Sequence, residues 1–194
     1  MPEPVRIDDH ALDNLRYIRE AMERSSSFTS IPGVGGAIIG ATAIVATWLG
    51  SSAIDPARWM RIWLLEAVVA AIVGAITIAI KARAAETPFM SGAARRFFIS
   101  YSAPMIAGAL LTFGLAAAGH YELMPALWLL LYGTAFVSSG AFSIRLIPVM
   151  GVCFMLLGCA ALFVPLAGGN VLMGIGFGGL HVLFGILIAR SYGG

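Results

Sequence analysis

Three side chains that can carry a proton lie inside long apolar stretches of the sequence: Glu66, Tyr132 and His181. An ionisable group inside a membrane span is costly to bury, so we expect it to serve a function or to be paired. At a rise of about 1.5 Å per residue, the three lie roughly 10, 14 and 18 Å from one membrane surface. A carboxylate, a phenol and an imidazole at staggered depths can relay a proton or bind a small polar ligand. They form the candidate ligand or proton pathway, provided that their spans converge.

Two of these residues also have a structural interpretation. Glu66 lies close to the end of its span, where it can be neutral or paired with Arg58 or Arg61. His181 lies on a glycine-rich face, which is expected to pack against another helix. It can therefore be a neutral histidine bonded to a carbonyl or a hydroxyl group.

No other set of residues in the sequence supports a cofactor or a catalytic reaction. Cys153 and Cys159 lie six apart, about 240° around a helix, and no third metal ligand lies nearby. His120 is expected in a loop and His181 in mid-span, so they do not suit a haem with two histidine ligands. We predict no metal, no cofactor and no enzymatic activity.

The elements that carry these residues must be membrane helices. The 194 residues are 59% hydrophobic and only 11% charged, against about 25% charged in a soluble domain. The mean hydropathy is +0.90. This composition excludes a soluble globular domain, a disordered chain and a nucleic-acid-binding protein. The fold class is therefore all-α, a polytopic membrane bundle.

Six apolar stretches approach the roughly 20 residues that a bilayer span requires. They make up a transmembrane domain over residues 31–194, preceded by a segment over 1–30. A tyrosine–glycine pair at 132–133 and Gly140 align with a phenylalanine–glycine pair at 177–178 and Gly185. This offset of 45 is consistent either with a parallel repeat of three hairpins or with convergent small-residue packing. The predicted spans are 32–50, 59–80, 97–118, 123–142, 145–165 and 169–189.

The basic residues predict the orientation of the bundle. Ten of the twelve Lys and Arg residues fall on one side of the predicted membrane, and only Arg58 and Arg61 on the other. Both termini should therefore be cytoplasmic. Trp59, Trp63, Tyr121 and Trp128 then cluster near the outer boundary, as an aromatic belt would. The ten are Arg6, Arg16, Arg19, Arg24, Lys81, Arg83, Arg95, Arg96, Arg145 and Arg190.

The segment before the first span has the pattern of an amphipathic helix, from about residue 8 to 25. Leu12, Leu15, Ile18 and Met22 recur at spacings of three and four. Residues 1–30 hold four basic and six acidic side chains, a net charge of −2. A helix that binds anionic lipid is usually rich in Lys and Arg. We therefore expect its apolar stripe to dock on a protein surface.

This segment also carries a resemblance. The string that begins at Tyr17, Tyr-Ile-Arg-Glu-Ala-Met-Glu-Arg-Ser-Ser-Ser-Phe-Thr-Ser-Ile-Pro-Gly, is followed by hydrophobic spans. It resembles a group of small, uncharacterised bacterial inner-membrane proteins, most strongly over residues 12–45. The resemblance implies a bacterial inner-membrane location and supplies no active site.

These features favour a non-catalytic membrane protein, an accessory or sensor component that engages a protein partner through its N-terminal helix. Its other partner is the lipid bilayer, and no nucleic acid is expected. Two alternatives remain open. The first is a small-solute or proton-linked transporter or channel that uses Glu66, Tyr132 and His181. The second is an anchor subunit of a larger membrane complex.

Overall fold

The described part of this computed structural model is almost entirely helical. It comprises residues 14–18, 27–84 and 91–192. The helices are α2 (Gly33–Ser51), α3 (Pro56–Ala84), α4 (Gly92–Ala118), η1 (Tyr121–Leu123), α5 (Met124–Gly140), α6 (Leu146–Ala161), α7 (Leu166–Met173), η2 (Gly174–Leu180) and α8 (His181–Tyr192).

Within the described residues, five helices are long and apolar enough to cross a membrane. They are α2, α3, α4, η1 with α5, and the continuous stretch of α7, η2 and α8. Their bounds lie within a few residues of five of the predicted spans. The fifth predicted span, 145–165, corresponds to α6, which has only 16 residues. A polytopic membrane bundle is thus supported, whereas the count of six spans is not confirmed.

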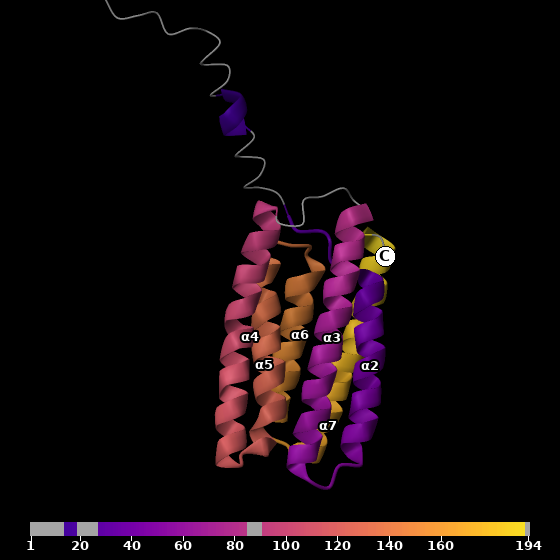
Figure 1. Cartoon of the computed structure of the whole chain (residues 1–194), viewed down its shortest axis with the longest axis vertical. Helices are drawn as coiled ribbons and strands as arrows, with labels where there is room; N and C mark the ends of the chain where they lie inside the picture. Colours follow the sequence, from indigo (N-terminus) through magenta and orange to yellow (C-terminus); the bar gives the residue numbers. More distant parts are fainter. Residues whose placement is uncertain (1–13, 19–26, 85–90, 193–194) are drawn as a thin grey trace, which may run out of the picture.

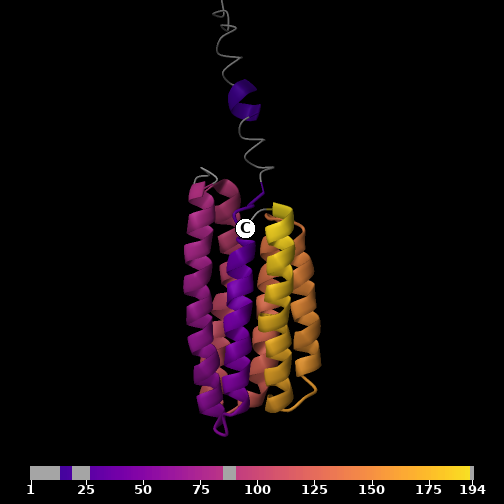
Figure 2. The same cartoon turned by 90° about the vertical axis from the view of Figure 1, so that its right-hand side faces the viewer.

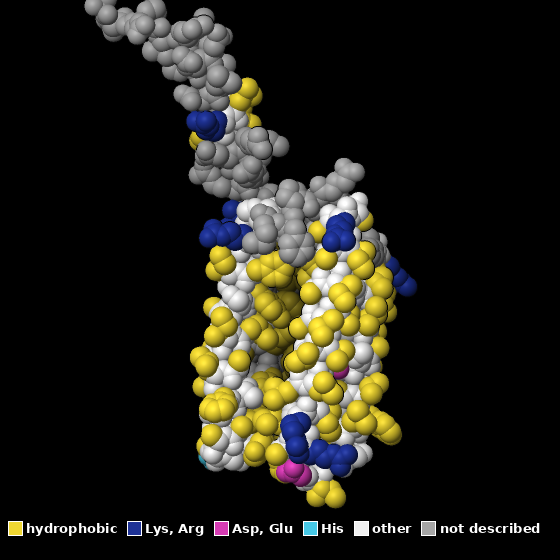
Figure 3. Space-filling model, viewed as in Figure 1, with side chains coloured by type: hydrophobic (Ala, Val, Ile, Leu, Met, Phe, Trp, Pro, Cys, Tyr) yellow, Lys and Arg dark blue, Asp and Glu magenta, His cyan; other side chains and the backbone are white. Residues whose placement is uncertain are grey.

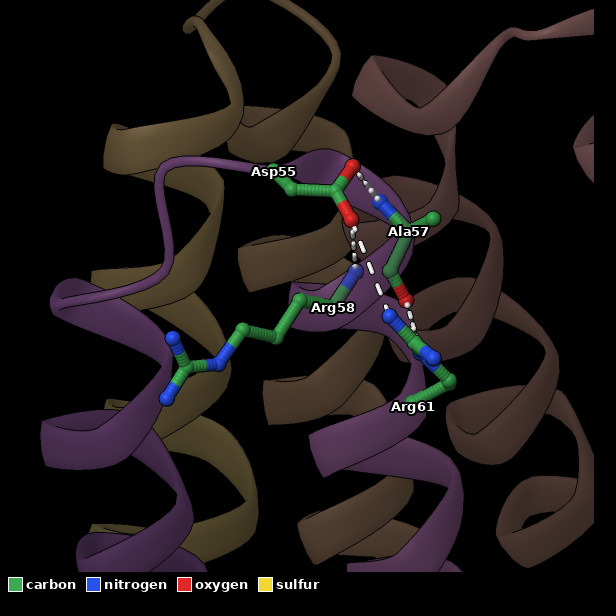
Figure 4. A network of polar contacts seen from close by, with 4 residues as sticks. All are labelled: Asp55, Ala57, Arg58 and Arg61. Carbon is green, nitrogen blue, oxygen red and sulfur yellow. Dashed lines mark hydrogen bonds and ion pairs between the residues drawn. The ribbon is translucent and has the colours of Figure 1, made fainter.

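The ends of the helices follow ordinary capping chemistry. Asp55 directly precedes Pro56, the first residue of α3. Its carboxylate accepts hydrogen bonds from the backbone N–H groups of Ala57 (3.0 Å) and Arg58 (3.1 Å) in the first turn of the helix (Figure 4). A side-chain acceptor at this place satisfies N–H groups that a helix leaves unpaired. Ser91 begins α4 in the same way, and Gly119, with φ of 79°, ends it in the left-handed conformation.

The helices stand side by side and run from one end of the bundle to the other (Figures 1 and 2). Around the bundle the order is α4, α5, α6, the α7–η2–α8 stretch, α2 and α3. We call one end the Phe28 end; the start of α2, the end of α3, the start of α4 and the end of α8 lie there. The opposite end, where α3 begins, is the Trp59 end. On the face drawn in Figure 3, charged side chains gather at the two ends and hydrophobic side chains cover much of the surface between them.

Two seams of the bundle are closed by backbone contacts at glycine. A Cβ atom on Gly133 of α5 would lie 2.6 Å from the carbonyl oxygen of Gly151 in α6. A Cβ atom on Gly185 of α8 would lie 2.6 Å from the backbone nitrogen of Ala37 in α2. Gly133 and Gly185 both belong to the two sequence segments, 132–140 and 177–185, that align at an offset of 45 residues. Close packing alone explains why glycine occurs there, and the three-hairpin repeat stays a prediction.

The chain that enters α2 is fastened to the Phe28 end. The backbone N–H of Phe28 donates to the Phe142 carbonyl (2.7 Å), and the Ser143 hydroxyl donates to the Phe28 carbonyl (2.7 Å). The Phe28 ring is 6% exposed, with its centroid 5.0 Å from that of Phe97 and 5.6 Å from that of Phe98. We call this set of contacts the Phe28 anchor.

The predicted amphipathic helix is only partly described. Residues 14–18 are helical, and within them Leu15 is 63% and Ile18 is 52% exposed. Leu12 and Met22 lie outside the described residues. The amphipathic helix from 8 to 25 therefore stays a prediction, while two members of its apolar stripe are exposed to solvent.

The predicted aromatic belt is wrong for two of its four members. Trp59 and Trp63 are 2% and 4% exposed, so their rings lie inside the bundle instead of facing lipid headgroups. Tyr121 and Trp128 are half-buried. Hydropathy placed these residues at the correct end of the helices, but it does not report which side of a helix faces inward.

Candidate functional site

The structure brings Tyr132 and His181 together in the middle of the bundle. The Tyr132 hydroxyl of α5 lies 2.7 Å from Nε2 of His181, the first residue of α8. His181 is 4% exposed and Tyr132 is half-buried. This pairing agrees with the structural interpretation of His181 as a histidine bonded to a hydroxyl group. It also joins two of the three residues of the predicted pathway.

Aromatic rings surround this pair. The Tyr132 ring lies 4.6 Å from that of Phe136, 4.9 Å from that of Phe154 and 5.0 Å from that of Phe177, measured between centroids. All three contacts are edge-to-face or tilted, which suits the quadrupoles of the rings. Tyr101 of α4 stands edge-on to Tyr132 at 6.2 Å. The site is therefore a polar pair inside an aromatic shell to which α4, α5, α6 and η2 all contribute.

A π-helical segment positions the histidine. η2 spans Gly174–Leu180 and ends directly before His181. π-Helical turns are rare and occur frequently at functional sites. Nδ1 of His181 is buried and has no hydrogen-bond partner among the described residues. A proton on Nδ1 would leave Nε2 to accept the hydrogen bond from Tyr132.

Glu66 lies elsewhere. Its Oε1 accepts a hydrogen bond from the Thr42 hydroxyl of α2 at 2.8 Å, and its side chain is half-buried. The proposed pairing with Arg61 does not form: Arg61 lies 3.7 Å from the Asp55 carboxylate instead (Figure 4). Among the described residues, no contact joins Glu66 to Tyr132 or to His181. The structure thus places the carboxylate at the α2–α3 seam and the other two residues in the aromatic shell.

A second polar cluster was missed by the sequence analysis. The Asn170 side chain of α7 accepts hydrogen bonds from the indole N–H groups of Trp59 (2.8 Å) and Trp63 (2.9 Å), and it donates to the Thr47 carbonyl (3.1 Å). Asn170 is buried. One amide therefore ties α7 to both α2 and α3. The sequence did contain a signal for this cluster: a lone asparagine in an apolar span, a residue type that forms hydrogen bonds between membrane helices.

The same end of the bundle is tied to α4 through stacked indoles. The rings of Trp59 and Trp128 are 5.5 Å apart and inclined by only 7°. The Trp128 indole N–H in turn donates to the Thr112 hydroxyl of α4 at 2.7 Å. Together with Asn170, these contacts lock the Trp59 end.

Within the described ranges no three His, Cys, Asp or Glu residues gather as a metal site would need. Comparisons with models of protein families, with curated proteins and with solved structures find no match for this chain.

Proposed function

We propose that the chain is a six-span protein of a bacterial inner membrane, with both termini in the cytoplasm. What supports the sixth span is chain direction: α5 ends at the Phe28 end, and α7 begins at the Trp59 end (Figures 1 and 2). The segment between them, α6, must return across the same thickness. It does so packed against α5, and the apolar Leu162 and Phe163 extend it.

The orientation rests on charge. Six basic residues of the described part lie at the Phe28 end, whereas Arg58 and Arg61 lie at the Trp59 end beside Asp55. The positive-inside rule puts the more basic end in the cytoplasm. The six are Lys81, Arg83, Arg95, Arg96, Arg145 and Arg190.

Our leading functional proposal is a non-catalytic accessory or sensor protein that engages a protein partner through its N-terminal segment. One observation carries it: the chain is anchored at Phe28, while Leu15 and Ile18 upstream expose their apolar side chains. Each such side chain gains roughly 1.5–3 kcal/mol when buried. An anchored segment with an unburied stripe is suited to capture a partner close to the membrane.

A lysine close to the Phe28 anchor ties the entry to α2 to two other spans. The Lys81 ammonium group at the end of α3 donates to the carbonyls of Ile31 and Tyr192, each at 3.1 Å. The entry to α2, the end of α3 and the end of α8 therefore meet at one lysine. A partner bound upstream of Phe28 would act on the junction of three spans.

Deleting residues 1–24 tests this proposal. The six spans should insert, and thermal stability in detergent should stay within about 2 °C of the full chain, because the Phe28 anchor is retained. The partner that co-purifies with the full chain should be lost. The matched control is Phe28→Ala, which should lower the melting temperature and keep the partner. A truncated protein that keeps its partner, or that loses as much stability as Phe28→Ala, would refute the proposal.

A proton or small-solute pathway is the second candidate. One observation favours it: the hydrogen-bonded Tyr132–His181 pair, whose Nδ1 is buried without a partner. The position of Glu66 at the α2–α3 seam shortens the predicted pathway to these two residues. For this reason the pathway takes second place.

A further inference from the structure

One seam of the bundle is open. Among the described residues, each neighbouring pair of helices around the ring packs closely except α3 and α4. Only 11% of the most apolar window of each of these two helices is buried, compared with 44% for the span that contains α5. Between them the space-filling surface is hollowed, with apolar side chains inside the hollow (Figure 3). We call this hollow the α3–α4 groove.

The groove has an aromatic floor. Tyr101, Tyr132, Phe136 and Phe177 belong to the central shell, yet all four are half-buried. These rings pack against one another in the centre of the bundle, and among the described helices α3 and α4 are the ring neighbours that do not pack together. A membrane-soluble molecule that enters sideways from the bilayer would therefore meet ring faces and edges.

Apolar side chains continue along the groove toward the Phe28 end, where Ile78 of α3 packs against the hydrophobic cluster that contains Phe28 and Phe97. At the Trp59 end, the stacked Trp59 and Trp128 rings join α3 to α5. A flexible hydrocarbon chain fits such a long, narrow, apolar space, in which polar groups would find few partners.

The charges at the Phe28 end indicate which headgroup is attached to that hydrocarbon chain. Arg83 at the end of α3 and Arg95 at the start of α4 are both exposed, and Figure 3 shows Lys and Arg side chains above both walls of the groove. The sequence from 81 to 96 has four basic residues and one acidic residue. Basic sites between membrane helices bind anionic lipid headgroups.

We propose that the α3–α4 groove binds an anionic glycerophospholipid, with its phosphate between Arg83 and Arg95 and one acyl chain against the aromatic floor. Tyr101 lies six residues beyond Arg95, about 9 Å along the helix. An acyl chain of one leaflet reaches about 15 Å, half of the hydrocarbon thickness, so it passes this ring. The site requires membrane insertion and is independent of the N-terminal partner.

Native mass spectrometry of the full chain tests the site. Delipidated protein is mixed with equal amounts of dioleoyl phosphatidylglycerol and dioleoyl phosphatidylcholine. We expect the phosphatidylglycerol complex to predominate roughly 10- to 30-fold, about fivefold for each arginine. The Arg83→Gln, Arg95→Gln double variant should lose this preference. The matched control, Arg58→Gln with Arg61→Gln, removes the same charge at the opposite end and should keep it.

A chain-length arm separates the groove from a headgroup site on the surface. Dihexanoyl phosphatidylglycerol has the same phosphate but chains too short to reach the aromatic floor, and inorganic phosphate has no chain. Neither should displace the dioleoyl lipid at equal concentration. Equal binding of the two dioleoyl lipids, equal loss in both double variants, or full displacement by a short-chain competitor would overturn the proposal.

Discussion

Replacing Gly185 with alanine should destabilise the bundle by about 2–3 kcal/mol. The new Cβ would lie 2.6 Å from the backbone nitrogen of Ala37 and 2.7 Å from the Gly33 carbonyl oxygen. Both atoms belong to the main chain of α2, so no side-chain rotation can relieve the contact. The seam between α8 and α2 must open, and α8 carries His181 as its first residue. Thermal unfolding in detergent measures the loss.

Gly114→Ala is the control for this substitution. Gly114 also lies in a membrane helix, but a Cβ placed there meets no atom within 4 Å. Alanine is the better helix former by up to about 1 kcal/mol, so this variant should be neutral or slightly more stable. Equal losses at Gly185 and Gly114 would mean that the close approach of α2 and α8 is absent.

Replacing Asn170 with alanine should cost about 2–4 kcal/mol, the second large effect. Two indole N–H groups, on Trp59 and Trp63, would lose their acceptor while staying buried. Hydrogen bonds between membrane helices contribute only about 0.6–2 kcal/mol each, so we expect a loss in the lower half of that range. The melting temperature should fall by roughly 5–10 °C.

Thr134→Val provides the comparison for Asn170. The Thr134 hydroxyl bonds only the Leu130 carbonyl of its own helix and is exposed, so its loss should shift the melting temperature by less than about 2 °C. The emission of the buried tryptophans gives a second measurement, since water that reaches them should shift their spectrum in Asn170→Ala. Asn170→Ala with wild-type stability and emission would contradict the lock at the Trp59 end.

Hydropathy was sufficient to predict the class of fold, because a continuous apolar stretch that crosses a bilayer must satisfy its backbone hydrogen bonds internally, as a helix does. For α6 the apolar stretch predicted a full span, whereas the helix has 16 residues, so the sixth span is not confirmed. Hydropathy was insufficient for the rotation of each helix about its axis. Trp59 and Trp63 were therefore expected to face the membrane boundary, whereas they bond Asn170 in the interior.

The candidate site, too, could be predicted from the sequence only in part. The glycine-rich face of the last span correctly indicated that His181 points into the bundle, and depth suggested that Tyr132 could meet it. The partner of Glu66 was not predictable, because a single sequence does not report which helices are neighbours. Thr42, which bonds Glu66, lies 24 residues earlier in a helix that carries no ionisable residue.

The central claim is that the N-terminal segment contacts a protein partner through one face, and site-specific photo-crosslinking in cells tests it most directly. A photoreactive phenylalanine derivative is placed at position 15, 18 or 17 in separate full-length chains. Leu15 and Ile18 lie on the predicted apolar face, whereas Tyr17 lies about 130° from the midpoint between them. Our account predicts one discrete adduct with another protein from positions 15 and 18, and little from 17. Equal adducts from all three positions, adducts only within the chain itself, or none at 15 and 18 would contradict it.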